Sequence, residues 1–343
     1  SSTSTTNPNT FGWIRRSNLF IDRVKTVPMS QEAKNHWTGV ARFFRATEFA
    51  NRVNDFGDFP WYGRVLAEDD PELYKPRDPR TLVMDSVLAD FQYAAANVRA
   101  KDGDKTVVNR YVVLARMSQV FLFEGTWQKY HAGNSAKATQ YLEAAKWAAN
   151  EVMTKGGYSI APDYRGLFNS LDLSANPEII LFRRYEPALI MHSLMSYVNQ
   201  HEAQLAGASK SAIDSYLAKD GLPISLSPLY QGDKTIYQAP AKKSAAMVNR
   251  DPRINSTFAD SLRITGYVKD YAYSNAGYAV IKFLNEAFLG TPESLSQTNS
   301  SDSPELRFGE VLLNYAEAAA ELGTLTQADL DASINKLRAR ANV

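Results

Sequence analysis

The feature that most constrains this chain is a pair of long segments whose apolar residues form a stripe along one helix face, joined by a short connection. Apolar residues recur at steps of three and four from Asn109 to Trp127 and again from Ser135 to Thr154, which is the period of one helix face. Residues 128–133 between them allow little more than a turn, so the two helices must run antiparallel. The chain therefore contains a helical hairpin whose apolar faces need neighbours to cover them.

The same design is repeated elsewhere. Residues 30–56 and 78–98 carry helical stripes, with Ser30 able to cap the first and Gly57 able to end it. Near the C-terminus a striped helix precedes a capping box of Thr326 and Asp329, which opens one further helix striped by Leu330, Ile334, Leu337 and Ala341. Alanine-rich hairpins of this kind are typical of tetratricopeptide-type repeats. The alternative is that the alanines only favour helix.

Residues 156–303 have a different character. Nine of the fifteen prolines lie at or beyond Pro162, and the helical stripes weaken. Residues 178–182 read as a short buried strand, and residues 212–217 as one short helix. We expect an all-α fold with tetratricopeptide-like helix hairpins packed beside a loop-rich irregular domain with minor β. The helical scaffold comprises residues 1–155 and 304–343, and residues 156–303 form a ligand-binding insert, since loops on a scaffold commonly carry recognition.

Composition narrows the classes of function. The 38 Lys+Arg and 37 Asp+Glu leave a net charge of +1, which argues against a nucleic-acid partner. The chain has no cysteine, and its four histidines lack zinc-site spacing, so we expect no metal and no cofactor. The carboxylate pairs Asp55/Asp58 and Asp69/Asp70 lie at a helix exit and in a loop, where backbone hydrogen bonding explains them better than glycoside hydrolysis. We expect no catalytic residues and no enzymatic activity.

Four ordered segments carry a resemblance to a known family. They are Phe56-Gly57-Asp58-Phe59-Pro60; Ala115-Arg116 with Glu124-Gly125-Thr126-Trp127; Gly221-Leu222-Pro223 with Arg250-Asp251-Pro252-Arg253; and the helix from Glu305 to Ala318, closed by Asn335 to Ala341. Each is common by itself, but in this order and spacing they resemble the SusD/RagB family. The family's lipidated N-terminal cysteine and its usual C-terminal region are missing. We therefore expect residues 1–343 to be one SusD-like unit that is incomplete at both ends.

The resemblance implies a surface lipoprotein that binds glycans and covers a SusC-like TonB-dependent transporter on the cell-surface face of an outer membrane. It implies contact with the membrane only through a lipid anchor that this chain lacks, and it brings no catalytic residues. The leading prediction is therefore non-catalytic binding of an oligosaccharide and its delivery to the transporter. The alternatives are a helical-repeat adaptor that binds another protein and, third, an all-α glycoside hydrolase or lyase.

Exposed aromatic rings beside polar groups are what a sugar-binding site needs, because rings stack on the C–H faces of sugars and polar groups bind the hydroxyls. The first candidates are Trp61, Tyr62 and Arg64, in a stretch rich in glycine and proline; alternatively these rings fill the seam between loop and helices. The second candidates lie in the insert, where each tyrosine could also serve packing. They are Tyr230, Asp270, Tyr271 and Tyr273, with Tyr237 and Tyr267 in the same cluster.

Other aromatic residues are assigned to the core. Trp37 and Trp147 lie within helical stretches, and Trp13 belongs with Phe20 and Val24 to an opening helix. Their positions on striped helices predict that all of them pack inside.

Overall fold

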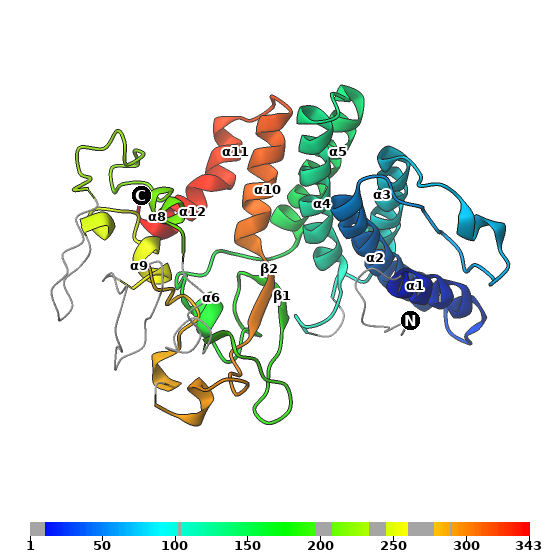
Figure 1. Cartoon of the computed structure of the whole chain (residues 1–343), viewed down its shortest axis with the longest axis horizontal. Helices are drawn as coiled ribbons and strands as arrows, with labels where there is room; N and C mark the ends of the chain where they lie inside the picture. The colour runs from blue at the N-terminus through cyan, green and yellow to red at the C-terminus, as the bar shows by residue number, and fades with distance from the viewer. Residues whose placement is uncertain (1–10, 102–103, 196–207, 233–244, 260–277, 289) are drawn as a thin grey trace. The chain divides into compact units, whose positions relative to one another are not determined.

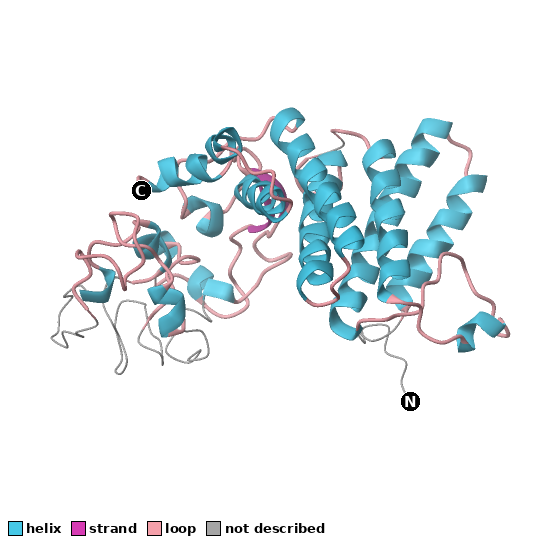
Figure 2. Ribbon diagram, turned by 90° about the horizontal axis from the view of Figure 1, so that it is seen from above, coloured by secondary structure: helices cyan, strands magenta, loops and turns pink. Residues whose placement is uncertain are grey.

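The computed structural model describes residues 11–101, 104–195, 208–232, 245–259, 278–288 and 290–343. Their contacts form two compact units: residues 1–158 with 308–333, and residues 159–307 with 334–343. The first unit is built mainly of long helices, whereas much of the second is loop (Figures 1 and 2). Within these described ranges no helix is both long and apolar enough to cross a membrane.

The helices of the first unit pack in sequence order (Figure 1). α1 packs on α2, α2 on α3, α3 on α4 and α4 on α5, and α10 then packs on both α4 and α5. The bounds are α1 Gly12–Arg23, η1 Val24–Thr26, α2 Gln31–Phe56, η2 Pro71–Tyr74, α3 Arg80–Asn97, α4 Arg110–Tyr130, α5 Ser135–Lys155, α10 Phe308–Glu321 and α11 Gln327–Ala332. The all-α fold and the predicted hairpin of α4 and α5 are confirmed.

Local capping explains where several of these helices begin. The Ser30 hydroxyl accepts a hydrogen bond from the backbone N–H of Ala33 at the start of α2, and Asn109 caps α4 in the same way. Thr326 and Asp329 form the complete capping box of α11. Such caps satisfy N–H groups that have no partner within the helix.

A line of aromatic rings runs through the core of the first unit. Phe43 of α2, Phe91 of α3, Phe121 of α4 and Tyr141 of α5 follow one another with ring centroids 5.5–6.1 Å apart. The last three rings are fully buried. One ring from each successive helix thus ties four helices into one core, at the edge-to-face and tilted geometries that aromatic pairs prefer.

The second unit contains short elements around a two-stranded sheet. β1 (Ile179–Arg183) pairs antiparallel with β2 (Ser303–Arg307), with Ile179 opposite Arg307 and Arg183 opposite Ser303. The other elements are α6 Gly166–Asn169, α8 Lys210–Asp214, η3 Ala245–Met247, α9 Arg253–Thr257, η4 Glu286–Phe288, η5 Pro292–Ser294 and α12 Ile334–Ala341. The predicted strand is confirmed within one residue.

Buried ion pairs join this sheet to α12. Glu178, which is fully buried just before β1, pairs with Arg307 of β2 at 3.1 Å and with Arg340 of α12 at 2.6 Å. A buried carboxylate needs such partners because its desolvation is costly. The ion pairs therefore connect three segments that are far apart in the sequence.

The spacing of the apolar residues at the C-terminal end predicts one helix, but the structure has two, α11 and α12. Ser333, which is fully buried, separates α11 from α12 with a backbone at φ −127° and ψ −92°. Its hydroxyl donates a hydrogen bond to the backbone carbonyl of Asp329, a local bond that competes with helical geometry. The two helices belong to different units.

The assignment of several tryptophans to the core is wrong. Trp37 and Trp147 are 41% and 44% exposed, and Trp13 is 57% exposed. Phe20 is also exposed, and only Val24 of this group is buried. Helical spacing shows that residues share a face, but that face is buried only where another element covers it.

Candidate functional site

The loop of residues 57–79 connects α2 to α3 and carries the first group of candidates. Gly57 ends α2 at φ +73°, a conformation that glycine adopts without strain. The backbone N–H of Phe59 donates to the carbonyl of Asp78 at 3.1 Å, and the Asp58 carboxylate accepts from the N–H of Arg80 at 2.8 Å. The loop is therefore closed at its base, and Asp58 hydrogen-bonds backbone as expected.

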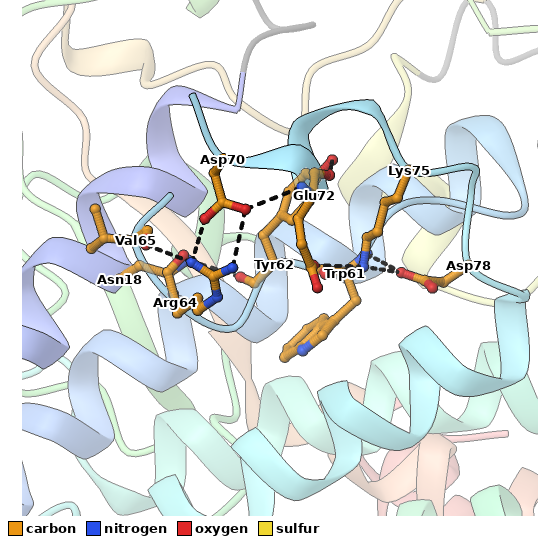
Figure 3. Close-up of polar contacts among 9 residues, drawn as sticks. All are labelled: Asn18, Trp61, Tyr62, Arg64, Val65, Asp70, Glu72, Lys75 and Asp78. Atoms are coloured by element: carbon orange, nitrogen blue, oxygen red, sulfur yellow. Dashed lines mark hydrogen bonds and ion pairs between the residues drawn. The ribbon is translucent and has the colours of Figure 1, made fainter. Parts of the chain in front are cut away.

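Trp61 lies half-buried between the loop and α2. Its ring centroid is 4.2 Å from that of Phe49, and its backbone N–H donates to Asp78 at 2.8 Å. Lys75 donates to the Trp61 carbonyl at 2.9 Å and pairs with Asp78 at 2.8 Å (Figure 3). These contacts are the ones expected if the Trp61 ring fills the seam between the loop and the helices. A role for Trp61 in ligand binding stays a prediction.

Tyr62 lies half-buried, and its ring has several neighbours. Its hydroxyl donates to the backbone carbonyl of Glu72 at 3.1 Å, the Lys75 ammonium is 5.1 Å from its ring centroid, and Phe11 meets it edge-on at 5.4 Å. Burial raises the pKa of Tyr62. The ring is therefore held in place, and its hydroxyl stays protonated at neutral pH.

Arg64 points from the loop toward solvent. Its guanidinium donates to the Asp70 carboxylate at 2.5 Å and 3.2 Å (Figure 3), and its side chain is 57% exposed. The hydrogen bond from Arg64 lowers the pKa of Asp70. Because a guanidinium carries five donors, Arg64 can hold Asp70 and still offer N–H groups to a bound hydroxyl.

A buried polar network fixes the backbone of this loop. Asp90 of α3 accepts two hydrogen bonds from Arg45 of α2, both at 2.8 Å. Arg45 donates to the Asn18 side-chain oxygen of α1 at 2.7 Å, and the Asn18 amide donates to the carbonyls of Tyr62 and Arg64 at 2.8 Å and 2.9 Å. Three helices thus hold the two candidate residues at a defined position.

A cavity of about 220 Å³ lies beside these residues. It combines aromatic rings and apolar side chains with arginine and amide groups, and all of its lining belongs to the first unit. The lining residues are Phe11, Ile14, Arg15, Asn18, Tyr62, Arg64, Leu66 and Leu73. Rings next to hydrogen-bond donors suit the two kinds of surface that a sugar presents.

The remaining candidates fall in the second unit. Tyr230 is half-buried, and the guanidinium of Arg250 lies 5.6 Å from its ring centroid. Asp270, Tyr271 and Tyr273 lie outside the described residues, as do Tyr237 and Tyr267. The structure therefore brings together Trp61, Tyr62 and Arg64, and the others stay predictions.

Several residues of this site were missed by sequence reasoning. Asn18, Lys75 and Asp78 hold the loop, and Phe11 and Arg15 line its cavity. Their contacts with residues 61–66 join positions 14 to 51 apart in the sequence, and no periodic pattern marks such pairs. The one available signal was the density of Asp, Glu and Lys in residues 68–78. A loop of this composition would need internal ion pairs to keep a fixed shape.

Two carboxylates near the cavity, Asp70 and Asp78, are held in their charged form. Burial opposes the ionisation of Asp78, but hydrogen bonds from Lys75 and Trp61 outweigh it, so its pKa is lowered like that of Asp70. A general acid needs a raised pKa. In the described part of the chain, no group of three His, Asp or Glu side chains is placed to hold a metal ion.

Comparison with known proteins decides the family. Residues 195–343 match the model of the SusD family. The fold is similar over 96% of this chain to a SusD-like carbohydrate-binding protein of Bacteroides fragilis, with a TM-score of 0.75 and 22% identity. Residues 195–343 thus belong to the SusD family, and the chain has the SusD-like fold.

Two further solved structures have a similar fold. One was solved with a xylogluco-oligosaccharide (TM-score 0.61, 19% identity, 97% of this chain and 63% of that one). Another is a laminarin-binding SusD-like protein (TM-score 0.60, 19% identity, 96% and 68%). This chain spans only 63% of the length of the Bacteroides fragilis protein. No curated protein sequence matches it.

Proposed function

We propose that this protein binds an oligosaccharide without altering it and delivers it to a SusC-like TonB-dependent transporter at the cell-surface face of the outer membrane. The observation that carries the binding step is the cavity between α1 and the loop of residues 57–79, where Tyr62 and Arg64 supply a ring and free donors. The SusD-like fold supports the same class of ligand. Two similar structures also support it, because one was solved with a xylogluco-oligosaccharide and the other is of a laminarin-binding protein.

Binding at this site would use a fixed ring and an adjustable cation. Tyr62 is held by Glu72, Lys75 and Phe11, so stacking a sugar on it orders little that is not already ordered. Arg64 is exposed and reaches the same cavity, so it can follow the hydroxyls of different sugars. Such a site favours a class of glycan more than a single linkage.

Binding without hydrolysis of the glycan is supported by the ion pairs and pKa values of the nearby carboxylates. Asp70 pairs with Arg64 and Asp78 with Lys75, and both have lowered pKa values. Neither is suited to donate a proton to a glycosidic oxygen at neutral pH. The prediction that the protein is not an enzyme rests on this and on the family.

A glycan array probed with the full product of the gene tests the binding step. We expect retention of one class of oligosaccharide, with a dissociation constant in the micromolar to millimolar range, and no new reducing ends after prolonged incubation with the retained glycan. Release of product that disappears on mutating one carboxylate would show a hydrolase instead.

The delivery step needs its own experiment. The gene product, tagged and purified from the outer-membrane fraction of its source organism, is expected to bring a TonB-dependent transporter with it. Recovery of the protein only from the soluble fraction would contradict the proposed location.

A further inference from the structure

Among the described residues, α1 and α2 form an apolar groove that takes no part in the binding proposed above. Four aromatic side chains line it, and each is exposed: Trp13 by 57%, Phe20 by 45%, Trp37 by 41% and Phe44 by 53%. The groove has a volume of about 560 Å³. A second hollow of about 530 Å³ shares Phe20 and Trp37 with it. Contiguous apolar surface of this kind marks an interface.

The two helices present the same pattern to the groove. On α1 the lining includes Trp13, Ser17 and Phe20, at steps of four and three. On α2 it includes Trp37, Ala41 and Phe44, at the same two steps. Each stripe has a large ring at both ends and a small side chain between them. Two matched stripes with small residues at the centre form the hole into which a side chain of a third helix packs.

The charges around the groove indicate what that third helix carries. Arg16 lies over the Trp13 ring at 4.6 Å, and Arg23 lines the adjoining hollow. No carboxylate among the described residues pairs with either arginine, and Glu48 at the rim is paired with Arg52 at 2.5 Å. The covering segment therefore needs apolar residues on one face and acidic residues on the flank that meets these arginines.

The length of similar proteins indicates where that segment comes from. The fold of the Bacteroides fragilis structure matches 96% of this chain, but this chain spans only 63% of that one. The main helix contacts of α1 are with α2 and η1, whereas α4 packs on α3, α5 and α10.

We infer that the groove between α1 and α2 is the docking surface for an amphipathic helix with an acidic flank, supplied by a part of the same polypeptide outside residues 1–343. This helix completes the first unit by covering Trp13, Phe20, Trp37 and Phe44. The scaffold that holds the glycan site is then continuous with the covered groove, since Asn18 of α1 holds the loop that carries Tyr62.

Oxidative footprinting of the full gene product tests this directly. Trp147 on α5 is an internal control, because its exposure of 44% lies between those of Trp37 and Trp13. If a helix of the same polypeptide covers the groove, hydroxyl radicals oxidise Trp13 and Trp37 at least several-fold more slowly than Trp147. Equal or faster oxidation of Trp13 overturns the proposal. Protection that is lost on dilution also overturns it, because a second copy would then be the occupant.

A photo-reactive phenylalanine analogue in place of Phe44 identifies the occupant. The expected result is a cross-link within the monomer, mapped to a peptide outside residues 1–343 that has acidic and apolar residues in helical spacing. A cross-link to a second copy, to a transporter or to another protein overturns the proposal, and so does a gene product with no further segment. Trp147 replaced by the same analogue is expected to give no such cross-link.

A stability measurement gives an independent readout. In the full gene product, Phe44→Glu places a charge in the covered groove and is expected to lower Tm by about 5 °C or more. Trp147→Glu changes an exposed ring outside the groove and is expected to change Tm by less. Equal shifts for the two variants contradict the proposal.

Discussion

Glu124, fully buried in α4, accepts three hydrogen bonds from the guanidinium of Arg80 at the start of α3, at 2.7–3.0 Å. Arg80 in turn lies over the ring of Trp127 at 4.4 Å. Glu124 and Trp127 belong to one of the segments that resemble the SusD/RagB family. The physical role of that segment is therefore to fix α4 against the start of α3, where the loop of residues 57–79 ends.

Removing the charge of Glu124 tests this role. Glu124→Gln leaves the Arg80 guanidinium without its counter-ion in a buried site, and we expect a loss of about 3–5 kcal/mol in the free energy of unfolding. Urea denaturation measures the loss. Glu143→Gln, on the exposed side of α5, is the control and is expected to have almost no effect. Similar effects of both changes would mean that the ion pair contributes little.

A second prediction concerns the crossing of α4 and α5. A Cβ atom added at Gly125 would lie 2.6 Å from Cγ of Leu142 and 3.0 Å from its backbone nitrogen. Gly125→Ala should therefore destabilise the protein by about 1–3 kcal/mol, although alanine favours helix more than glycine does. Urea denaturation measures the change.

The double variant Gly125→Ala/Leu142→Ala identifies the cause. If the contact with the Leu142 side chain produces the strain, the cost of Gly125→Ala is smaller in the Leu142→Ala background than in the wild type. An equal cost in both backgrounds would place the strain elsewhere.

The helices could be predicted from the sequence, but the positions of their exposed faces could not. The helical period of the apolar residues, the capping side chains and Gly57 at the end of α2 are all local signals. The helices α2, α4 and α5 can therefore be predicted from short stretches of sequence. The break at Ser333 and the exposure of Trp37 depend on which elements cover a helix. That information lies in contacts between distant parts of the chain.

The candidate site was predictable in part for the same reason. A stretch with glycine, proline and adjacent rings marks a loop with aromatic residues, and it led to Trp61, Tyr62 and Arg64. The Asn18–Arg45–Asp90 network joins residues 27 and 45 positions apart. Polar partners at such separations leave no pattern in a single sequence.

The network gives a prediction about the loop. Asn18→Leu removes both donors to the carbonyls of Tyr62 and Arg64 and leaves those groups without a partner, so we expect faster hydrogen exchange at the amides of residues 61–66. Asn150→Leu, at an exposed position of α5, is the control. Unchanged exchange in the loop would show that Asn18 does not hold it.

Lys282 in the second unit gives a pH-dependent prediction. Burial, with the nearby charge of Arg307, lowers the pKa of Lys282 to about 8, and its ammonium lies 3.7 Å from the ring centroid of Phe168. Between pH 8 and the ordinary lysine pKa, the unfolded chain holds a proton that the folded chain has released. The stability of the wild type relative to Lys282→Met should therefore rise with pH in this window.

Unfolding of both proteins in urea at pH 7.5, 8.5 and 9.5 measures this difference. Lys129 is the control, because the hydrogen bond to Glu321 raises its pKa. Relative to Lys129→Met, the wild type should show no such gain with rising pH. A flat difference for Lys282→Met would mean that its ammonium is fully hydrated in the folded protein.

The most direct test of glycan binding at the cavity is calorimetric titration of the full gene product with the oligosaccharide that it retains on an array. Tyr62 lines the cavity, whereas Tyr74, in the same loop, is 86% exposed and lies outside it. Loss of a stacked ring should lower affinity about 2- to 10-fold. We expect that loss for Tyr62→Ala and wild-type affinity for Tyr74→Ala; equal affinities of wild type and Tyr62→Ala would contradict binding at this site.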